Sequence, residues 1–464
     1  MPRELPTNSS HSPFPVTRSE RLGLTRLAAI IVFVAVSSIP GWARSQDSTS
    51  VGINNELLLE LKSPKAKDRA KAAKEIGKRG NVSDIPALVA ALHDSSASVR
   101  RQVVLALASF TTPASLNGLI EATRDSDPAV RTLAVEAVTG YYTGHPPSTG
   151  FVGFVEKEYK SAKRGFAPDD TEVDPGTVVD PRAVSALDRA MMDTHIERAA
   201  RAAARGLGIL DAKAAVPDLI VTAHSPDENL AREALNSLVK IKDTSAGPRL
   251  MDLLKSSDAA IQQDAAVTVG ILRTRPAVPQ LQWLAQNSPN STTRRKALEG
   301  LAYIGDPASR PIFQKDLSSR NKAVRTYAAE GLGRSGDTPA LPDLLNAAVV
   351  EKDANVKLAM EFALTALGND EYLSQMASAL GSRLHGDTAQ AYLTELAQNP
   401  SFLPMLYPFL SSPNAAIRSR LCLVLMYSGD ASSVPGLEKA SHDSNATVAA
   451  DALRALSAIR ARGQ

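Results

Sequence analysis

A pattern of two helices joined by a turn recurs along almost the whole chain at a spacing of about 31 residues. Its clearest copies place a basic residue just after a polar turn and read SSASVRRQVVLALASF (95–110), SDPAVRTLAVEAVTGY (126–141), RNKAVRTYAAEGLGRSGD (320–337) and PNAAIRSRLCLVLMYSGD (413–430). Repetition at this length is typical of solenoids, in which each repeat packs against its neighbours. The pattern therefore predicts one stack of helix pairs, although a chain of 464 residues would otherwise divide into several compact domains.

Each repeat is expected to contain a short first helix and a longer second helix. Proline opens several first helices, where its missing N–H group would be unpaired anyway: 85–94, 216–224, 278–286 and 341–349. The second helices follow turns rich in Asp, Ser and Asn, which cap helix starts, and carry apolar stripes such as Val324, Tyr327, Ala328, Gly331 and Leu332. Three of them end in Gly-Asp, at 305–306, 336–337 and 429–430, which predicts a left-handed glycine followed by an aspartate that holds the next turn.

The number of repeats follows from one apolar position that recurs near the start of each expected second helix. It is occupied by Val99, Val130, Ile196, Leu230, Ile261, Thr293, Val324, Val356, Ile417 and Val448, with degenerate copies near Asp68 and Asp387. The count is therefore about twelve. A basic residue follows in five copies: Arg100, Arg131, Arg325, Lys357 and Arg418. These residues could form a binding stripe, but each recurs beside an acidic turn, so we favour ion pairs and carbonyl contacts between layers. We assign Asp306, Asp337 and Asp430 to the same structural ladder.

The shared pattern D-x-x-V-R-x-x-A-x-x-A-L-G-x-I-G-D resembles the short bacterial HEAT repeat, the type also found in phycobilin lyases. The resemblance covers roughly 55–140 and 182–462. It implies an all-α fold, a right-handed α-solenoid of about twelve HEAT-like helix pairs with one non-repeat insertion. HEAT arrays serve many unrelated partners, so the resemblance implies a protein or peptide partner on the concave face without identifying it.

The amino-terminal segment has the features of a secretory signal. Three basic residues precede an apolar stretch at 27–36: Arg18, Arg21 and Arg26. Gly41 and Ala43 occupy the −3 and −1 positions of a cleavage site, and the apolar stretch is shorter than the roughly 20 residues of a membrane span. We expect a signal peptide with a long n-region at 1–43, a flexible leader at 44–54, and a periplasmic or secreted mature protein without a stable membrane span. The alternative is an uncleaved signal that anchors the chain in the membrane.

The repeat pattern disappears between 143 and 181. We therefore divide the rest of the chain into a repeat block at 55–142, an insertion at 143–181 and a second repeat block at 182–464. The insertion is rich in Pro and Gly, and six of the chain's 10 Phe and 9 Tyr residues lie in or beside it: Tyr141, Tyr142, Phe151, Phe154, Tyr159 and Phe166. Aromatic side chains are favoured at interfaces, which makes these six residues candidates for partner binding. Alternatively, they cover an exposed flank of the solenoid, or the insertion hides one eroded repeat.

Composition and motifs give no sign of catalysis or nucleic-acid binding. The 52 basic and 49 acidic residues leave a net charge of only +3, which argues against a nucleic-acid partner. Cys422 is the only cysteine and lies in an apolar run, so we expect a buried structural thiol. The chain has no His-Glu-x-x-His motif, nucleophile elbow, phosphate loop or dinucleotide fingerprint, and we expect His195 to cap a second helix.

We therefore expect a noncatalytic scaffold with no catalytic, cofactor-binding or metal residues. The alternative is a HEAT-like enzyme, either a lyase or a metal-dependent hydroxylase or oxidoreductase. In the related deoxyhypusine hydroxylases, recurring His-Glu pairs bind iron, and this chain contains no His-Glu dipeptide. That absence disfavours the enzyme.

Overall fold

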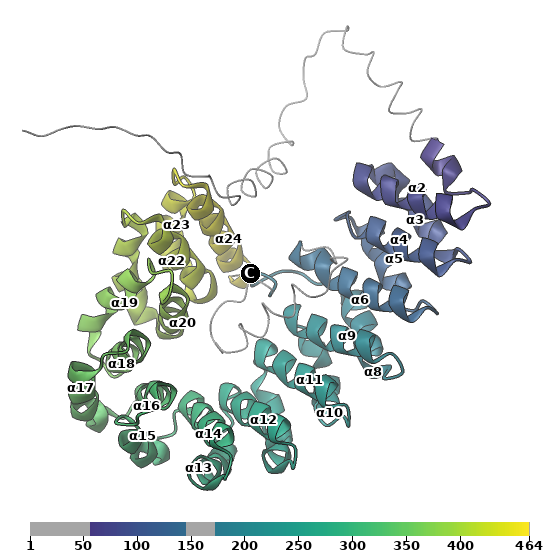
Figure 1. Ribbon diagram of the computed structural model, residues 1–464. Coiled ribbons are helices and arrows are strands. Elements are labelled where there is room, and N and C mark those ends of the chain that lie inside the picture. Colours follow the sequence, from purple (N-terminus) through teal and green to yellow (C-terminus); the bar gives the residue numbers. More distant parts are fainter. Residues whose placement is uncertain (1–55, 145–171, 464) are drawn as a thin grey trace, which may run out of the picture. The chain divides into compact units, whose positions relative to one another are not determined.

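The structure is a computed structural model that describes residues 56–144 and 172–463. The residues from Leu57 onward form one compact unit (Figure 1). In the described residues every regular element is helical, and the helices follow one another in pairs, which we call layers. With the short helical segment at 56–60, these residues form twelve layers, as predicted.

The first helices are short, and they are α3 (Ile85–Ala90), α5 (Pro113–Ala122), α8 (Pro181–Met192), α10 (Val216–Thr222), α13 (Val278–Asn287), α15 (Arg310–Asp316), α17 (Leu341–Val350), α19 (Leu373–Ala379), α21 (Leu403–Leu406) and α23 (Val434–Ala440). In one layer the 3₁₀ helix η4 (Thr244–Lys255) takes this place, because Pro248 inside it cannot donate an α-helical hydrogen bond. Shorter 3₁₀ turns flank other first helices: η1 (Val82–Asp84), η2 (Ala91–His93), η3 (Lys213–Ala215), η5 (Arg275–Ala277), η6 (Pro307–Ser309), η7 (Thr338–Ala340), η8 (Asp370–Tyr372), η9 (Pro400–Phe402), η10 (Tyr407–Ser411) and η11 (Ala431–Ser433).

The second helices are longer and form the inner row of the unit, with the first helices outside them (Figure 1). They are α2 (Ala66–Arg79), α4 (Ala97–Leu107), α6 (Pro128–Thr143), α9 (Glu197–Ile209), α11 (Glu228–Ile241), α12 (Ala259–Ile271), α14 (Ser291–Ile304), α16 (Lys322–Arg334), α18 (Ala354–Ala366), α20 (Gly386–Leu396), α22 (Ala415–Ser428) and α24 (Ala446–Arg462). Each packs on the second helix of the next layer, and one continuous apolar core runs through the stack. Small residues permit this close approach: a Cβ atom on Gly270 would lie 2.4 Å from the Cα atom of Gly300 in the next layer.

Helix starts follow the predicted chemistry. The Asp127 side chain accepts hydrogen bonds from the N–H groups of Ala129 and Val130 at the start of α6, and Asp or Asn caps most other second helices in the same way.

The ends of the second helices follow the predicted pattern less closely than their starts. Gly305 and Gly336 are left-handed, with φ of 63° and 66°, whereas Gly429 has φ of −70° and an extended backbone, so the prediction for Gly429 is wrong. Because Gly429 leaves the helix in the extended region, its Asp-capped turn begins without a left-handed residue.

The stack is continuous across the insertion. Helix α6 packs directly on α9, and a Cβ atom on Gly206 of α9 would lie 2.4 Å from Oγ1 of Thr139 on α6. Among the described residues, no further layer lies between these two helices.

The register of α9 differs from the predicted one. Ile196 is the half-buried N-cap residue of α9, and Ala199, three positions further along the chain, takes the buried position instead. His195 is exposed and does not cap the helix, contrary to our expectation. Val324 and Tyr327 of the predicted α16 stripe are only partly buried. The other three members of the predicted stripe, Ala328, Gly331 and Leu332, are buried.

Candidate functional site

The predicted basic ladder lies along the turns between first and second helices. Arg100 illustrates it: Nε and a terminal nitrogen each lie 2.7 Å from a carboxylate oxygen of Asp125 in the next layer, and the guanidinium also donates to the carbonyl oxygen of Asp94. Equivalent pairs with the next layer are Arg131–Asp193, Arg325–Glu351 and Arg418–Asp443. The Arg418 guanidinium holds the pKa of Asp443 below its ordinary value by hydrogen bonding to the carboxylate. These arginines therefore connect neighbouring layers.

One predicted residue does not belong to this ladder, and two residues that were not predicted do. Lys357 is exposed and makes no such pair within the part of the chain that the structure describes. Sequence reasoning missed Arg69, which binds Asp94 with an Nε–Oδ2 distance of 2.6 Å, and Arg294, which donates to the carbonyl oxygen of Ser288. Both follow the counted repeat position directly, so the same spacing could have identified them.

Two of the three ladder aspartates cap turns. Asp306 accepts a hydrogen bond from the N–H of Ala308, and Asp430 accepts one from the N–H of Ser432. Asp337 differs, because it makes no capping bond and pairs with Arg310 at 2.7 Å.

Only two of the six candidate aromatic residues belong to the described chain. Tyr141 and Tyr142 lie near the end of α6 with their rings edge to face at 5.0 Å. The Tyr142 hydroxyl accepts a hydrogen bond from the N–H of Asp180, just before α8, and burial raises its pKa. Tyr142 thus joins the two ends of the insertion. Phe151, Phe154, Tyr159 and Phe166 lie outside the described residues.

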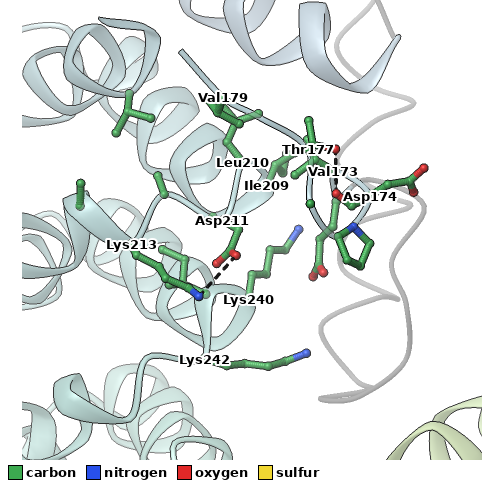
Figure 2. Close-up of a pocket in the computed structure, with 18 of the residues that line it drawn as sticks. Val173, Asp174, Thr177, Val179, Ile209, Leu210, Asp211, Lys213, Lys240 and Lys242 are labelled. Carbon is green, nitrogen blue, oxygen red and sulfur yellow. Dashed lines mark hydrogen bonds and ion pairs between the residues drawn. The ribbon is translucent and has the colours of Figure 1, made fainter. Parts of the chain in front are cut away.

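A cleft of about 560 Å³ opens where the chain leaves the insertion (Figure 2). Its walls are the returning segment 172–179, the turn after α9, the end of α11 and Tyr427 of α22. The returning segment is held by a hydrogen bond from the N–H of Val173 to the carbonyl oxygen of Ile209, 3.1 Å long. The cleft thus combines residues from four parts of the chain.

The polar wall of the cleft carries both charges. Asp211 lies 4.0 Å from Lys213, and burial raises the pKa of this aspartate. Lys240 and Lys242 extend from the end of α11 into the same space (Figure 2). The polar wall therefore presents both signs of charge to the cleft.

Three successive layers place a charged residue in the left-handed region. Asp211, Lys242 and Arg273 have φ of 49°, 55° and 50°, and they follow the second helices α9, α11 and α12. The next layers place glycine there: Gly305, Gly336 and Gly368. This conformation costs a residue with a side chain about 1–2 kcal/mol relative to the right-handed region. Strained backbone at residues that carry a side chain often marks a functional site, so these three positions are candidate functional residues.

Further along the inner row, a buried polar network joins α16 to α20. Arg334 is buried, pairs with Glu395 of α20 at 2.9 Å and lies over the rings of Tyr303 and Phe362. Arg273 also reaches Glu395, at 3.1 Å. The network bridges layers that are not adjacent in the chain and fixes their packing.

The described residues contain no group of His, Cys, Asp and Glu that could hold a metal ion. None of their helices has the length and apolar character needed to cross a membrane. Cys422 is fully buried, and burial raises its pKa to about 12, which makes the thiol a poor nucleophile.

Paired helices, a continuous core and interlayer ion pairs define an α-solenoid. The family model for HEAT repeats matches residues 54–139, 216–292 and 278–365. These matches together span more than half of the chain, which therefore belongs to the HEAT repeat family.

Solved structures share the fold at low identity. The complex of CpcE and CpcF of phycocyanin lyase from Nostoc sp. PCC7120 is 20% identical, with a TM-score of 0.36 over 57% of this chain and 94% of that one. Importin beta is 13% identical, with a TM-score of 0.44 over 90% and 64%. Human deoxyhypusine hydroxylase is 17% identical, with a TM-score of 0.25 over 62% and 96%. No curated protein matches the chain.

Proposed function

We propose that this protein is a noncatalytic scaffold outside the cytoplasm that binds a protein or peptide on the inner row of its solenoid. The observation that carries the proposal is the run of three charged left-handed residues, Asp211, Lys242 and Arg273. Two of them line the cleft, and the third forms an ion pair on the inner row. A stacked array presents such a surface already ordered, so little backbone entropy is lost when a partner docks.

Site-specific photocrosslinking tests the binding surface. A benzophenone side chain at Lys242 lies beside the cleft, and the same group at Trp283, an exposed residue of the first helix α13, provides the control on the outer row. We expect the full chain, irradiated in an extract of its own cell envelope, to form protein adducts through position 242. Adducts that form only through position 283 would contradict binding on the inner row.

The compartment rests on the basic and apolar pattern at 18–43. We expect the protein recovered from outside the cytoplasm to begin at Arg44 when its amino terminus is sequenced. An exported protein that still begins at Met1 would rule out cleavage at this site and favour the anchored alternative.

A further inference from the structure

The returning segment 172–179 contacts the last helix, α24, although the two are far apart in the chain. Nε of Arg454 on α24 lies 2.9 Å from Oδ2 of Asp174, and a terminal guanidinium nitrogen bonds the other carboxylate oxygen. The two residues are 280 positions apart. A solenoid layer normally contacts only its neighbours, so this contact requires a separate explanation.

A second contact lies beside the ion pair. Gly176 has φ of 86°, and a Cβ atom there would lie 2.6 Å from the Cβ atom of Ala461 on α24. The turn that presents Gly176 is closed by hydrogen bonds from the N–H and the hydroxyl of Thr177 to the carbonyl oxygen of Asp174. Tyr427 of α22, the helix packed on α24, lines the same cleft as the segment. The returning segment thus contacts α24 at two points: the ion pair of Asp174 with Arg454, and Gly176 against Ala461.

The ion pair between Asp174 and Arg454 is a weak contact because both side chains are partly exposed to solvent. The side chains of Asp174 and Arg454 are 38% and 45% exposed, so water and salt screen their attraction. On its other side, the segment is held to α9 by the backbone bond of Val173 and to α6 through Asp180 and Tyr142. The joint with α24 is therefore expected to open before the joint with the central layers.

We propose that Asp174 and Gly176 form a reversible clasp that fastens the central layers to α24 and that opens as ionic strength rises. Opening separates the cleft wall at 172–179 from the wall at Tyr427 and so widens the cleft. The clasp is a property of this chain alone and does not depend on the proposed scaffold function.

Distance measurement between spin labels tests the clasp in the full chain. Labels at Glu228→Cys on α11 and Ala450→Cys on α24 are both on exposed residues, and the buried Cys422 does not compete for the reagent. We expect Asp174→Asn and Arg454→Gln to increase the long-distance population about two- to fivefold at low salt, the range of an exposed ion pair. The charge-swapped pair Asp174→Arg with Arg454→Asp should lower this population again relative to Asp174→Asn, although it loses the pair of Arg454 with Asp451 within α24.

Two further variants separate a clasp from general damage. Gly176→Val should open the contact at any salt concentration, because the new side chain meets Ala461 and the positive φ disfavours valine. Lys78→Gln removes an exposed ion pair with Glu75 on α2 and should leave the distances unchanged. Helical circular dichroism must match the wild type in every variant used. Identical distance distributions in wild type, Asp174→Asn and Gly176→Val would overturn the proposal.

Discussion

Gly336 and Lys242 occupy equivalent left-handed positions after α16 and α11, with φ of 66° and 55°. No atom lies within 4 Å of a Cβ atom placed on Gly336, so only the backbone conformation favours glycine there. At Lys242 the same backbone carries a long charged side chain beside the cleft. The two positions thus share one backbone conformation, and only Lys242 places a side chain beside the cleft.

We predict opposite effects of substitution at these two positions. Gly336→Ala should lower the free energy of unfolding by about 1 kcal/mol, because alanine enters the left-handed region with strain. Lys242→Gly should raise it by a similar amount, roughly 0.5–1 kcal/mol, and should weaken partner recovery. Urea unfolding of both variants measures the two effects. A destabilised Lys242→Gly protein would show that the lysine serves the fold rather than a partner.

Asp188 on α8 gives a pH prediction. Burial and the neighbouring carboxyl of Asp218 on α10 raise the pKa of Asp188 to about 6, above the unfolded value of about 3.9. Between these values the folded state binds more protons than the unfolded state, so the free energy of unfolding falls as pH rises. This contribution is fully present below about pH 4 and is lost as pH rises through about 6.

Asp188→Asn should therefore melt at a higher temperature than the wild type at pH 7, and the difference should shrink toward pH 4. Thermal unfolding in a series of buffers across this range measures the effect. A difference in melting temperature between the two proteins that stays the same at all pH values would show that the pKa of Asp188 is not raised in the folded state.

At the scale of elements, the seam between second helices determines stability. Val356 on α18 is 1% exposed, whereas Val349 on the neighbouring α17 is 85% exposed. Val356→Asp should lower the free energy of unfolding by about 3 kcal/mol or more, because it places a carboxylate without a partner in the seam. Val349→Asp is the matched control and should change it by less than about 0.5 kcal/mol. Chemical denaturation of both variants tests the seam, and equal effects would mean that this valine does not lie in it.

Element boundaries were predictable wherever a strong local signal exists. Val216, Val278 and Leu341, each followed by proline, begin first helices at the residues expected, because proline at the second position fixes the backbone without loss of a hydrogen bond. The start of α9 was missed, since the buried position expected at Ile196 lies three residues further along, at Ala199. A period count assumes equal spacing and cannot detect such a shift.

At the scale of the whole molecule, most contacts among the described residues join neighbouring layers, but two sets of contacts within 56–144 and 172–463 join distant ones. Arg334 and Glu395 bridge over the α18 layer, and Asp174 reaches Arg454 across 280 residues. Repetition in the sequence predicts the first kind of contact, because each repeat carries the same complementary surfaces. The second kind depends on the accumulated rotation of many layers, for which no local pattern provides a signal.

By itself, the sequence determined that this protein is a stack of helix pairs, where most pairs begin, and that basic residues at the turns face acidic ones. These properties depend on residues within about one repeat of each other, so spacing and capping chemistry reveal them. Only the tertiary structure decided which charged residues adopt left-handed conformations, that the cleft forms beside Lys242, and that Asp174 meets Arg454. The chain has 52 basic and 49 acidic residues, so many distant pairs are conceivable. The path of the backbone in space determines which of them meet, and no pattern in the sequence indicates that path.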